Sequence, residues 1–374
     1  MVPETPALAT QGPIPAIPPM KVLIGLSGGV DSSVAALLLK QQGFDVVGAT
    51  MKIWRDGKYA GGDRDACFGA GEADDVAAAE AFCRRIGIPY QAFDCSAEYE
   101  AEIVAHFRAE YLAGRTPNPC VRCNATMKFG LLPRMAAKAG VAFDRFATGH
   151  YARTDFVGGR HRLLRAADPA KDQSYFLYRL DQAQLARHLF PVGGMTKAEV
   201  RAIARAHGLD AADKPDSQDF YSGDTAELIG APDRPGDIVD ESGNVLGRHT
   251  GFWKYTVGQR KGIGVAAAEP LYVVELDACR NRVVVGAVER AKRHALVAES
   301  CNWVSIAPPE AEIPVAVKVR SAGQPVAGAF VRPLGDGRFA ARFEAGIHGV
   351  APGQSAVFYD GDVLLGGGII GSAE

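Results

Sequence analysis

The chain of 374 residues is predicted to be an α/β protein, with a doubly wound parallel sheet followed by mainly β structure. Three observations lead to this prediction. Apolar runs of strand length alternate with helical patterns from Lys21 to about Asp216. A glycine-rich turn joins the first apolar run to the first helical pattern, and helical periodicity fades after Asp216. Such alternation is typical of a parallel sheet covered by helices.

The elements of the first part follow in a regular order. The expected strands are Lys21–Leu26, Asp45–Lys52, Pro89–Asp94 and Asp144–Gly149. The expected helices are Ser32–Gln42, Glu72–Gly87, Ala97–Ala113, Asn124–Ala139, Asp181–His188 and Thr196–His207. Ligands of such sheets bind at the carboxyl ends of the strands. The Ser27–Ser33 turn, Met51 and Gly149-His150 are therefore expected on one rim.

The second part reads as short strands separated by glycine and proline. Pro235–Asn244 is expected to form one hairpin, and Leu271–Leu276 with Arg282–Gly286 another. The stretch Ala295–Ile370 is almost entirely strand-like and suits a small β-barrel. The predicted domains are thus a disordered leader (1–19), a first domain (20–216), a central mainly β linker domain with some α+β character (217–292) and a C-terminal β-barrel (293–374).

The bulk composition excludes several classes of protein. A formal charge of −2 gives no global basic field, so any RNA binding must depend on local patches. The longest apolar runs are too short for a membrane span, and the leader has no positive cluster typical of a signal peptide. Seven cysteines in a chain of this size do not indicate a disulfide framework. A reducing cytoplasm is expected, with Cys120-x-x-Cys123 as a redox, sulfur or metal site.

The turn Leu26-Ser27-Gly28-Gly29-Val30-Asp31-Ser32-Ser33 is the most informative stretch. Its glycines let the backbone turn tightly and approach a ligand. The serines and the following helix N-terminus offer hydrogen-bond donors to a polyphosphate. The turn has no lysine, unlike the kinase-type phosphate loop. Backbone amides are therefore expected to hold most of the phosphate charge, with Mg²⁺ near Asp31.

The loop Arg115–Asn124 is the second informative stretch, because it places two thiols between prolines and a helix. Asn118-Pro119 disfavours helix, and the following residues can cap the helix Asn124–Ala139. A thiol there would feel the helix dipole and Arg122, and both favour the thiolate. A thiolate at this position suits a nucleophile or a sulfur carrier. The alternatives are a buried structural pair and a zinc site. The chain has no second Cys-x-x-Cys that would complete a zinc site.

Together these motifs resemble the tRNA-specific 2-thiouridylase family, one of the ATP-pyrophosphatase-type adenylating enzymes with an adenine nucleotide alpha-hydrolase-like fold. The matching motifs begin near residue 20 and continue to the end of the chain. They include Gly25–Ser33, Gly114–Pro119, Cys123-Asn124, Lys128-Phe129, Ala147–Tyr151, Lys171–Leu177, Phe190–Gly193, Gly258–Gly262 and Pro352–Tyr359.

The resemblance implies ATP-dependent 2-thiolation of the wobble uridine of tRNA, in the cytoplasm. The C2 oxygen is adenylated, pyrophosphate leaves, a cysteine persulfide supplies sulfur, and AMP leaves. The implied cofactors are ATP and Mg²⁺, and the implied partners are tRNA and a sulfur donor protein. Domain 20–216 becomes the ATP-binding adenylation domain.

The resemblance also assigns individual residues. ATP binding falls on Gly25, Leu26, Ser27, Gly28, Gly29, Val30, Asp31, Ser32, Met51 and Gly149. Contacts with tRNA fall on Asn118, Pro119, His150, Lys171, Asp172, Gln173, Arg320, Ser321 and Gln354. Cys123 falls on the family's nucleophile, with Cys120 beside it.

One departure from the family affects the sulfur chemistry. The family's second catalytic cysteine, the persulfide carrier, is replaced by Tyr221. Cys120 and Cys123 dividing the work is the preferred explanation, ending in a disulfide that a reductant reopens. Alternatively, an iron–sulfur cluster with a third ligand from Cys67 or Cys95 delivers sulfide, an accessory protein brings the persulfide, or activity is lost or altered.

Two other functions remain open from the residues. A non-thiolating adenylating enzyme of the same fold would not need the cysteine pair. An ATP-sensing module would not need the Lys171–Gln173 loop or a barrel placed to hold RNA.

Overall fold

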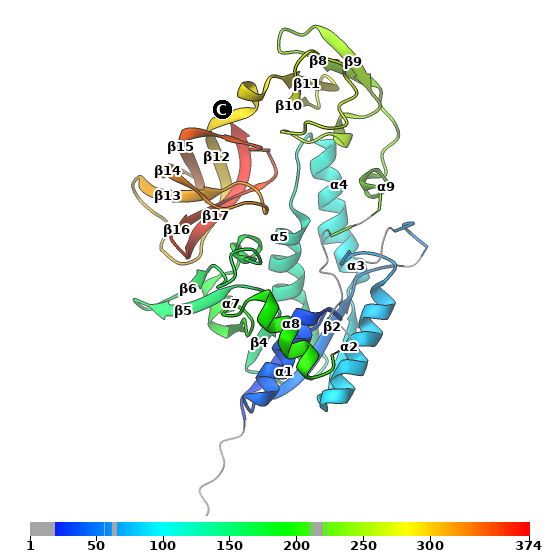
Figure 1. Ribbon diagram of the computed structural model, residues 1–374, viewed down its shortest axis with the longest axis vertical. Helices are drawn as coiled ribbons and strands as arrows, with labels where there is room; N and C mark the ends of the chain where they lie inside the picture. Colours follow the sequence, from blue (N-terminus) through cyan, green and yellow to red (C-terminus); the bar gives the residue numbers. More distant parts are fainter. Residues whose placement is uncertain (1–18, 56, 62–65, 210–211, 213–219, 222) are drawn as a thin grey trace, which may run out of the picture.

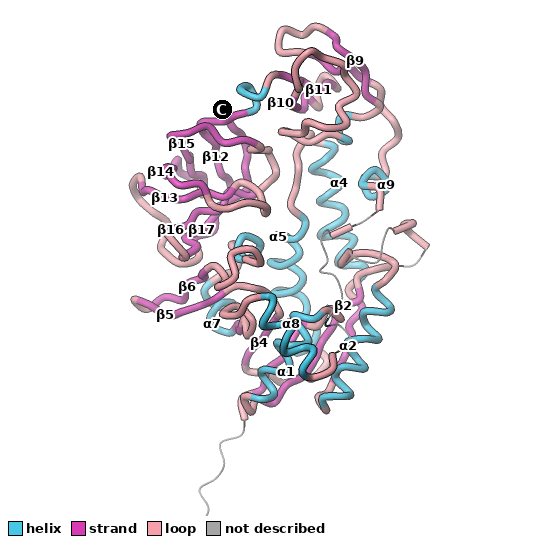
Figure 2. Tube along the Cα trace, in the orientation of Figure 1, coloured by secondary structure: helices cyan, strands magenta, loops and turns pink. Residues whose placement is uncertain are grey.

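The computed structural model describes residues 19–55, 57–61, 66–209, 212, 220–221 and 223–374. The predicted leader and the predicted boundary at 216/217 therefore lie outside the described residues, apart from residue 19. Figure 1 shows three bodies: a helix-covered sheet, a small sheet at the far end of α4, and a barrel beside α5. Figure 2 shows the change from mixed helices and strands to almost pure strand structure along the chain.

The first sheet is parallel and has the strand order β3-β2-β1-β4-β7. Its strands are β1 (Lys21–Gly25), β2 (Asp45–Lys52), β3 (Tyr90–Asp94), β4 (Arg145–Thr148) and β7 (His188–Leu189). The four strands predicted from the sequence are confirmed to within one residue at each end. The chain steps outward from β1 through β2 to β3, then returns to β4 on the other side of β1. This reversal creates a topological switch point between β1 and β4, where ligands of such sheets bind.

Two apolar clusters cover the two faces of this sheet. Val22 and Ile24 join the cluster of α1 (Val30–Gln41), α2 (Glu72–Ile86) and α8 (Lys197–Ala206). Leu23, between them, belongs to the cluster on the opposite face, as strand alternation requires. Each of these fully buried side chains contributes about 1.5–3 kcal/mol.

Two long helices supply the opposite face. The first consists of α3 (Ser96–Tyr99), a π-helical segment (Glu100–Val104) and α4 (Ala105–Leu112). The second consists of α5 (Pro119–Cys123), a π-helical segment (Asn124–Leu131) and α6 (Leu132–Lys138). The shorter helices are the 3₁₀ turn Ser174–Leu177, α7 (Gln182–Arg187) and α9 (Thr225–Ile229).

The central sheet has the order β10-β11-β8-β9 and confirms both predicted hairpins. Its strands are β8 (Gly236–Val239), β9 (Val245–His249), β10 (Tyr272–Asp277) and β11 (Arg282–Gly286). The linking 3₁₀ turns are Phe252–Lys254 and Val288–Ala291. The end of α4 reaches this sheet, because a Cβ on Gly114 would lie 3.1 Å from the Leu276 carbonyl oxygen.

The predicted C-terminal barrel is confirmed as six antiparallel strands, closed by pairing of the first with the last. Its strands are β12 (Lys292–Trp303), β13 (Ile313–Lys318), β14 (Val326–Gly335), β15 (Arg338–His348), β16 (Ser355–Asp360) and β17 (Val363–Ala373). The sequence did not predict the hairpin β5 (Arg153–Val157) and β6 (Arg160–Leu164). This hairpin leaves the first domain and pairs through β6 with β17, so the barrel is joined to the first domain by a shared sheet.

Among the described residues, no helix has both the length and the apolar character needed to cross a membrane.

Candidate active site

The turn between β1 and α1 is shaped as a phosphate cradle. Gly28 has φ +71°, and a Cβ there would lie 2.6 Å from the Asp75 carbonyl oxygen, so glycine is required. Gly29 caps α1 in extended conformation, and a Cβ there would meet only Ser27 Oγ, at 3.4 Å. The space beside the helix start is therefore open, and the N–H groups of the first helical turn face no intrahelical partner.

Side chains of the turn itself and of the neighbouring strand β2 hold this turn in shape. Thr50 Oγ1 donates to the Leu26 carbonyl at 2.9 Å, and Ser33 Oγ donates to the Gly29 carbonyl at 2.9 Å. Ser32 Oγ accepts from the Ser27 amide at 3.3 Å. Leu26 and Val30 are buried, so only their backbone can serve a ligand. The shape of the cradle is thus held by hydrogen bonds within the protein itself.

The surroundings of Asp31 differ from the prediction, because its carboxylate forms an ion pair with a lysine from α8. Lys197 Nζ contacts Asp31 Oδ1 at 2.7 Å and Oδ2 at 2.8 Å, and the Tyr151 hydroxyl donates to Oδ1 at 2.8 Å. The cradle is therefore not free of lysine, and the Asp31 carboxylate already has a cationic partner. The described residues hold no group of three or more His, Cys, Asp or Glu side chains placed for a metal ion. The expected Mg²⁺ at Asp31 does not fit this arrangement.

The ends of β2 and β4 complete the rim. Gly149 lies so close to α1 that a Cβ there would be 2.5 Å from Ser32 N. His150 follows it, and its Nδ1 lies 2.8 Å from Thr148 Oγ1. Burial, aided by Lys128 and His188, lowers the pKa of His150 well below 6.5, so the imidazole is neutral. Met51 is partly buried at the end of β2, opposite Phe93 of β3.

The cysteine helix begins earlier than predicted. Asn118 is its N-cap, with Oδ1 accepting from Val121 N at 3.2 Å, and Pro119 occupies the first helical position. Cys120 is therefore in the first turn, and Cys123 lies one turn further on rather than at the N-terminus. The sequence had expected the helix to start at Asn124 because Asn-Pro disfavours helix, but Pro at this position needs no N–H partner.

The expected low-pKa thiol is not found at Cys123. Its side chain is 6% exposed, and burial raises its pKa to about 12, although Lys128 opposes this. Arg122 does not help, because its guanidinium donates to Glu102 Oε2 at 2.9 Å and to the Glu102 carbonyl at 2.7 Å. Desolvation of the thiolate outweighs the helix dipole one turn from its end.

A π-helical segment brings Lys128 onto the cysteine face. In an α-helix, residues five apart are separated by about 140°. Here the Leu132 amide donates to the Met127 carbonyl, five residues back, so residues five apart nearly align. Burial lowers the pKa of Lys128, but the thiols of Cys123, Cys67 and Cys120 outweigh burial and raise it. Lys128 is thus the cation that interacts with the three cysteines Cys67, Cys120 and Cys123.

The barrel touches the cysteine loop directly. Thr116 N donates to the Pro352 carbonyl at 2.7 Å, and Gln354 Nε2 donates to the Pro117 carbonyl at 3.4 Å. Gly353 has φ +91°, and a Cβ there would lie 2.9 Å from Thr116 N. The predicted residues Asn118, Pro119 and Gln354 are therefore brought together, from sequence positions more than 200 apart.

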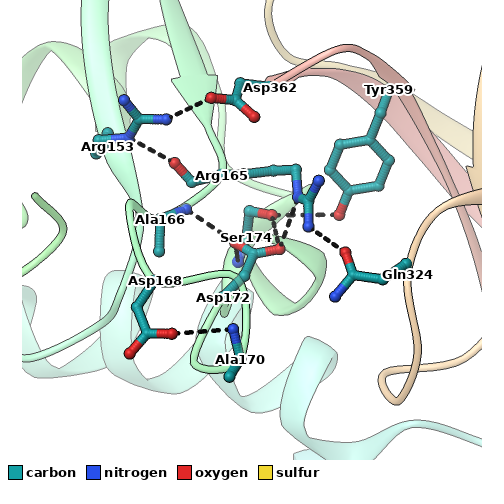
Figure 3. A network of polar contacts seen from close by, with 10 residues as sticks. All are labelled: Arg153, Arg165, Ala166, Asp168, Ala170, Asp172, Ser174, Gln324, Tyr359 and Asp362. Carbon is teal, nitrogen blue, oxygen red and sulfur yellow. Dashed lines mark hydrogen bonds and ion pairs between the residues drawn. The ribbon is translucent and has the colours of Figure 1, made fainter. Parts of the chain in front are cut away.

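The loop predicted to contact RNA is also a joint between domains (Figure 3). The Asp172 carboxylate accepts from the Ala166 and Ser174 amides, both at 3.1 Å, and pairs with Arg165 at 3.5 Å. Its side chain is only 2% exposed, so it organises the loop. Gln173 Oε1 accepts from Tyr151 N at 2.9 Å, while Lys171 is half-buried.

Arg320 and Ser321 lie on the barrel, in the segment between β13 and β14. Arg320 donates to the carbonyls of Gly349 and Val257, both at 2.8 Å, and so clamps the barrel to the central domain. It also lines a cavity of about 230 Å³ at this junction. Ser321 is exposed. A second cavity of about 370 Å³ lies at the far end of α1, so neither cavity coincides with the cradle.

Sequence reasoning missed Lys197, Tyr151 and the role of Lys128. One signal for Lys197 was available. Thr196 and Glu199 form a capping box, which puts Lys197 in the first turn of α8. A lysine in the first turn of a helix is unfavourable, because the N-terminal end of the helix dipole is positive. Such a lysine indicates that an anion from another part of the chain pairs with it.

Comparisons with known proteins agree with this architecture. Three family models match: a tRNA methyl transferase HUP domain (residues 20–221), a tRNA methyl transferase PRC-barrel domain (229–287) and an aminomethyltransferase β-barrel domain (293–370). The chain is 46% identical over 357 residues to a protein named tRNA-specific 2-thiouridylase MnmA from Endomicrobium trichonymphae, covering 94% of this chain and 99% of that one. It is 45% identical to the protein of the same name from Geotalea uraniireducens, covering 94% of each. A solved NMN synthetase from Francisella tularensis aligns with 16% identity and a TM-score of 0.33, over 56% of this chain and 68% of that one.

Proposed function

The chain belongs to the tRNA-specific 2-thiouridylase family, and we propose that it is a sulfurtransferase that uses ATP to replace the C2 oxygen of the wobble uridine of tRNA with sulfur. Identity of 46% across 94% of the chain and 99% of the relative carries this proposal. The site supports it, because a phosphate cradle and a cysteine helix meet at one rim. The Phe129 ring, on the cysteine helix, lies 5.6 Å from the His150 ring, and His150 follows the glycine packed on α1.

Adenylation is the first half of the reaction. The uridine C2 oxygen attacks the α-phosphorus of ATP, and pyrophosphate leaves with the electron pair of the broken bond. The C2 oxygen is then part of a phosphate ester and can leave as AMP when sulfur attacks C2. The open N–H groups at the start of α1 are suited to hold the phosphates, and Lys197 with Asp31 fixes the first turn. Mg²⁺ would accompany the nucleotide phosphates rather than a preformed protein site.

The tRNA is the second substrate of this proposal. Asn118 and Pro119 are suited to touch the target base, and Gln354 holds their loop from the barrel side. The base must leave its stack to reach this loop. Lys171, Gln173, His150 and Ser321 stay predicted contacts. Asp172 and Arg320 act on tRNA through the loop and the domain joint that they hold.

Cys123 is the proposed nucleophile of the sulfur step, and a sulfur donor protein in the cytoplasm supplies the sulfur atom to the enzyme. A disulfide between Cys120 and Cys123 meets a geometric obstacle. Residues three apart on a helix have Cβ atoms about 5–6 Å apart, whereas a disulfide needs about 3.5–4.5 Å. The Cβ atoms of that pair would have to approach by about 1–2 Å for the disulfide to close. The iron–sulfur alternative has no support from the described residues, which contain no suitable ligand group.

The test is nucleoside mass spectrometry of unmodified tRNA after incubation with ATP, a persulfide donor and the full chain. We expect 2-thiouridine at position 34 with one AMP released per modified uridine. Cys123→Ser should abolish thiolation and retain pyrophosphate release, while Cys279→Ser, an exposed thiol of the central domain, should change neither. Pyrophosphate release that does not depend on tRNA, without any thiolated product, would contradict the proposal.

A further inference from the structure

The segment around Cys67 lies beside the position where the family resemblance expects a second cysteine. That position is Tyr221 in this chain. The Phe68 amide donates to the Phe220 carbonyl at 2.9 Å, and the Cys67 thiol lies 3.7 Å from the same oxygen. The Phe68 and Tyr221 rings lie 6.1 Å apart. Cys67, from another part of the chain, therefore lies beside the position at which the family's second cysteine is expected.

The same segment is linked, through the first long helix, to the helix that carries Cys123. Phe68 stacks on Tyr99 with ring centroids 5.0 Å apart and planes 26° apart. One turn further along, the Glu102 carbonyl accepts from Arg122 Nε at 2.7 Å. Phe68, Tyr99 and Cys123 belong to one apolar cluster. The neighbours of the two cysteines are thus attached to one turn of helix.

The two thiols differ in access but share a cation. Cys67 is exposed, whereas Cys123 is buried and Cys120 is intermediate. Although the Cys67 residue is exposed, protein packed around its thiol desolvates it and raises its pKa, as burial does at Cys123, and Lys128 opposes both rises. A thiolate at Cys67 also raises the pKa of Cys123. The two thiols therefore share one nearby cation, and Lys128 favours the thiolate form of each.

We propose that Cys67 is the sulfur carrier of this chain and that Cys123 resolves the intermediate it forms. The proposal rests on the thiolation function proposed above and names the residue that replaces the missing second cysteine. It assigns to Cys120 no covalent step.

The steps balance in atoms and electrons. A donor persulfide passes its terminal sulfur to the Cys67 thiol, giving a Cys67 persulfide and a donor thiol. The terminal sulfur attacks C2 of the adenylated uridine, the C2–O bond breaks, and AMP leaves. The Cys123 thiolate then attacks Cys67 Sγ, so the bond to the transferred sulfur breaks and that sulfur remains on C2 as the thiocarbonyl. Protons from the persulfide and from Cys123 pass to solvent. A dithiol reductant supplies two electrons to reopen the Cys67–Cys123 disulfide.

The test is a single turnover with glutathione persulfide, ATP and unmodified tRNA, without reductant. Thiols are then alkylated, and the non-reduced peptides are mapped by mass spectrometry. We expect a Cys67–Cys123 disulfide in stoichiometry with the 2-thiouridine formed. A Cys120–Cys123 disulfide in its place would overturn the assignment.

Variants separate a chemical role from a structural one. Cys67→Ser should release pyrophosphate at the normal rate but lose at least 100-fold in persulfide-dependent AMP release and thiolation. Excess inorganic sulfide should restore its product, because hydrosulfide attacks C2 without a carrier. Cys279→Ser is the matched exposed-thiol control and should behave as the unaltered protein. Full persulfide-dependent activity in Cys67→Ser refutes the proposal, as does a loss of pyrophosphate release in both Cys67→Ser and Cys67→Ala that sulfide does not rescue. If the unaltered protein makes no 2-thiouridine with persulfide or sulfide, the proposed function itself fails.

Discussion

Gly149→Ala tests whether the fit between β4 and α1 shapes the nucleotide cradle. The added Cβ would lie 2.5 Å from Ser32 N, 2.7 Å from the Asp31 carbonyl carbon and 2.8 Å from Ser32 Cα. All three atoms are backbone atoms of the first turn of α1, so no side chain can turn away. Restoring an ordinary contact of about 3.4 Å requires the helix start to move by roughly 0.9 Å.

This displacement should affect both stability and activity. Overpacking of a tight contact costs about 1–3 kcal/mol, and each kcal/mol lowers the melting temperature of a domain of 150–250 residues by about 2–4 °C. A misplacement near 1 Å at a site that positions reacting groups can slow a reaction about 100-fold. We therefore expect a lower melting temperature together with weaker ATP binding and a slower release of pyrophosphate.

Thermal unfolding, ATP titration calorimetry and a pyrophosphate assay measure the three quantities. Gly194→Ala is the control, because a Cβ there meets nothing within 4 Å and the backbone does not need glycine. If Gly149→Ala matches this control in melting temperature, ATP affinity and rate, the cradle does not depend on the close contact.

Three further predictions follow from the contacts described. Lys197→Met removes the cation that pairs with Asp31. We expect the free energy of unfolding to fall by about 2 kcal/mol and ATP to bind roughly tenfold more weakly. Unchanged ATP affinity would show that the ion pair does not contribute to nucleotide binding. Arg320→Met removes one bond between the barrel and the central domain, to Val257, and one within the barrel, to Gly349. It should accelerate proteolysis near residues 287–292 while tRNA-independent ATP binding stays normal. Burial raises the pKa of several thiols to about 12. The folded protein therefore keeps protons on these thiols that the unfolded chain loses above pH about 9. The free energy of unfolding should fall between pH 9 and 12, by about 1.4 kcal/mol per pH unit for each thiol. The buried thiols in question are Cys83, Cys95 and Cys123. Urea denaturation at pH 8 to 10 measures this slope, which Cys83→Ala should reduce.

The order of elements could be predicted because it depends on local patterns. Strand β2 (Asp45–Lys52) is found with the predicted bounds, since its mainly apolar centre lies between two charged end residues that mark the limits of the strand. The hairpin β5–β6 was missed for the opposite reason. Its sequence is rich in arginine, and it becomes a strand pair because β17 offers an edge to β6.

In the candidate site too, some features follow from local sequence and others from tertiary packing. The amino-acid sequence alone determined the cradle, because positive φ at Gly28 and an open helix start depend on residues a few positions apart. It also indicated a helix from Asn124 beside the cysteine pair, whereas the structure begins that helix at Pro119 with Asn118 as its N-cap. Tertiary structure alone decided that Lys197 lies on Asp31, 166 residues away, and that Cys67 lies beside Phe220, 153 residues away. It also decided that the Cys123 thiol is protonated, because desolvation depends on which distant segments cover a side chain, and local sequence patterns do not encode that packing.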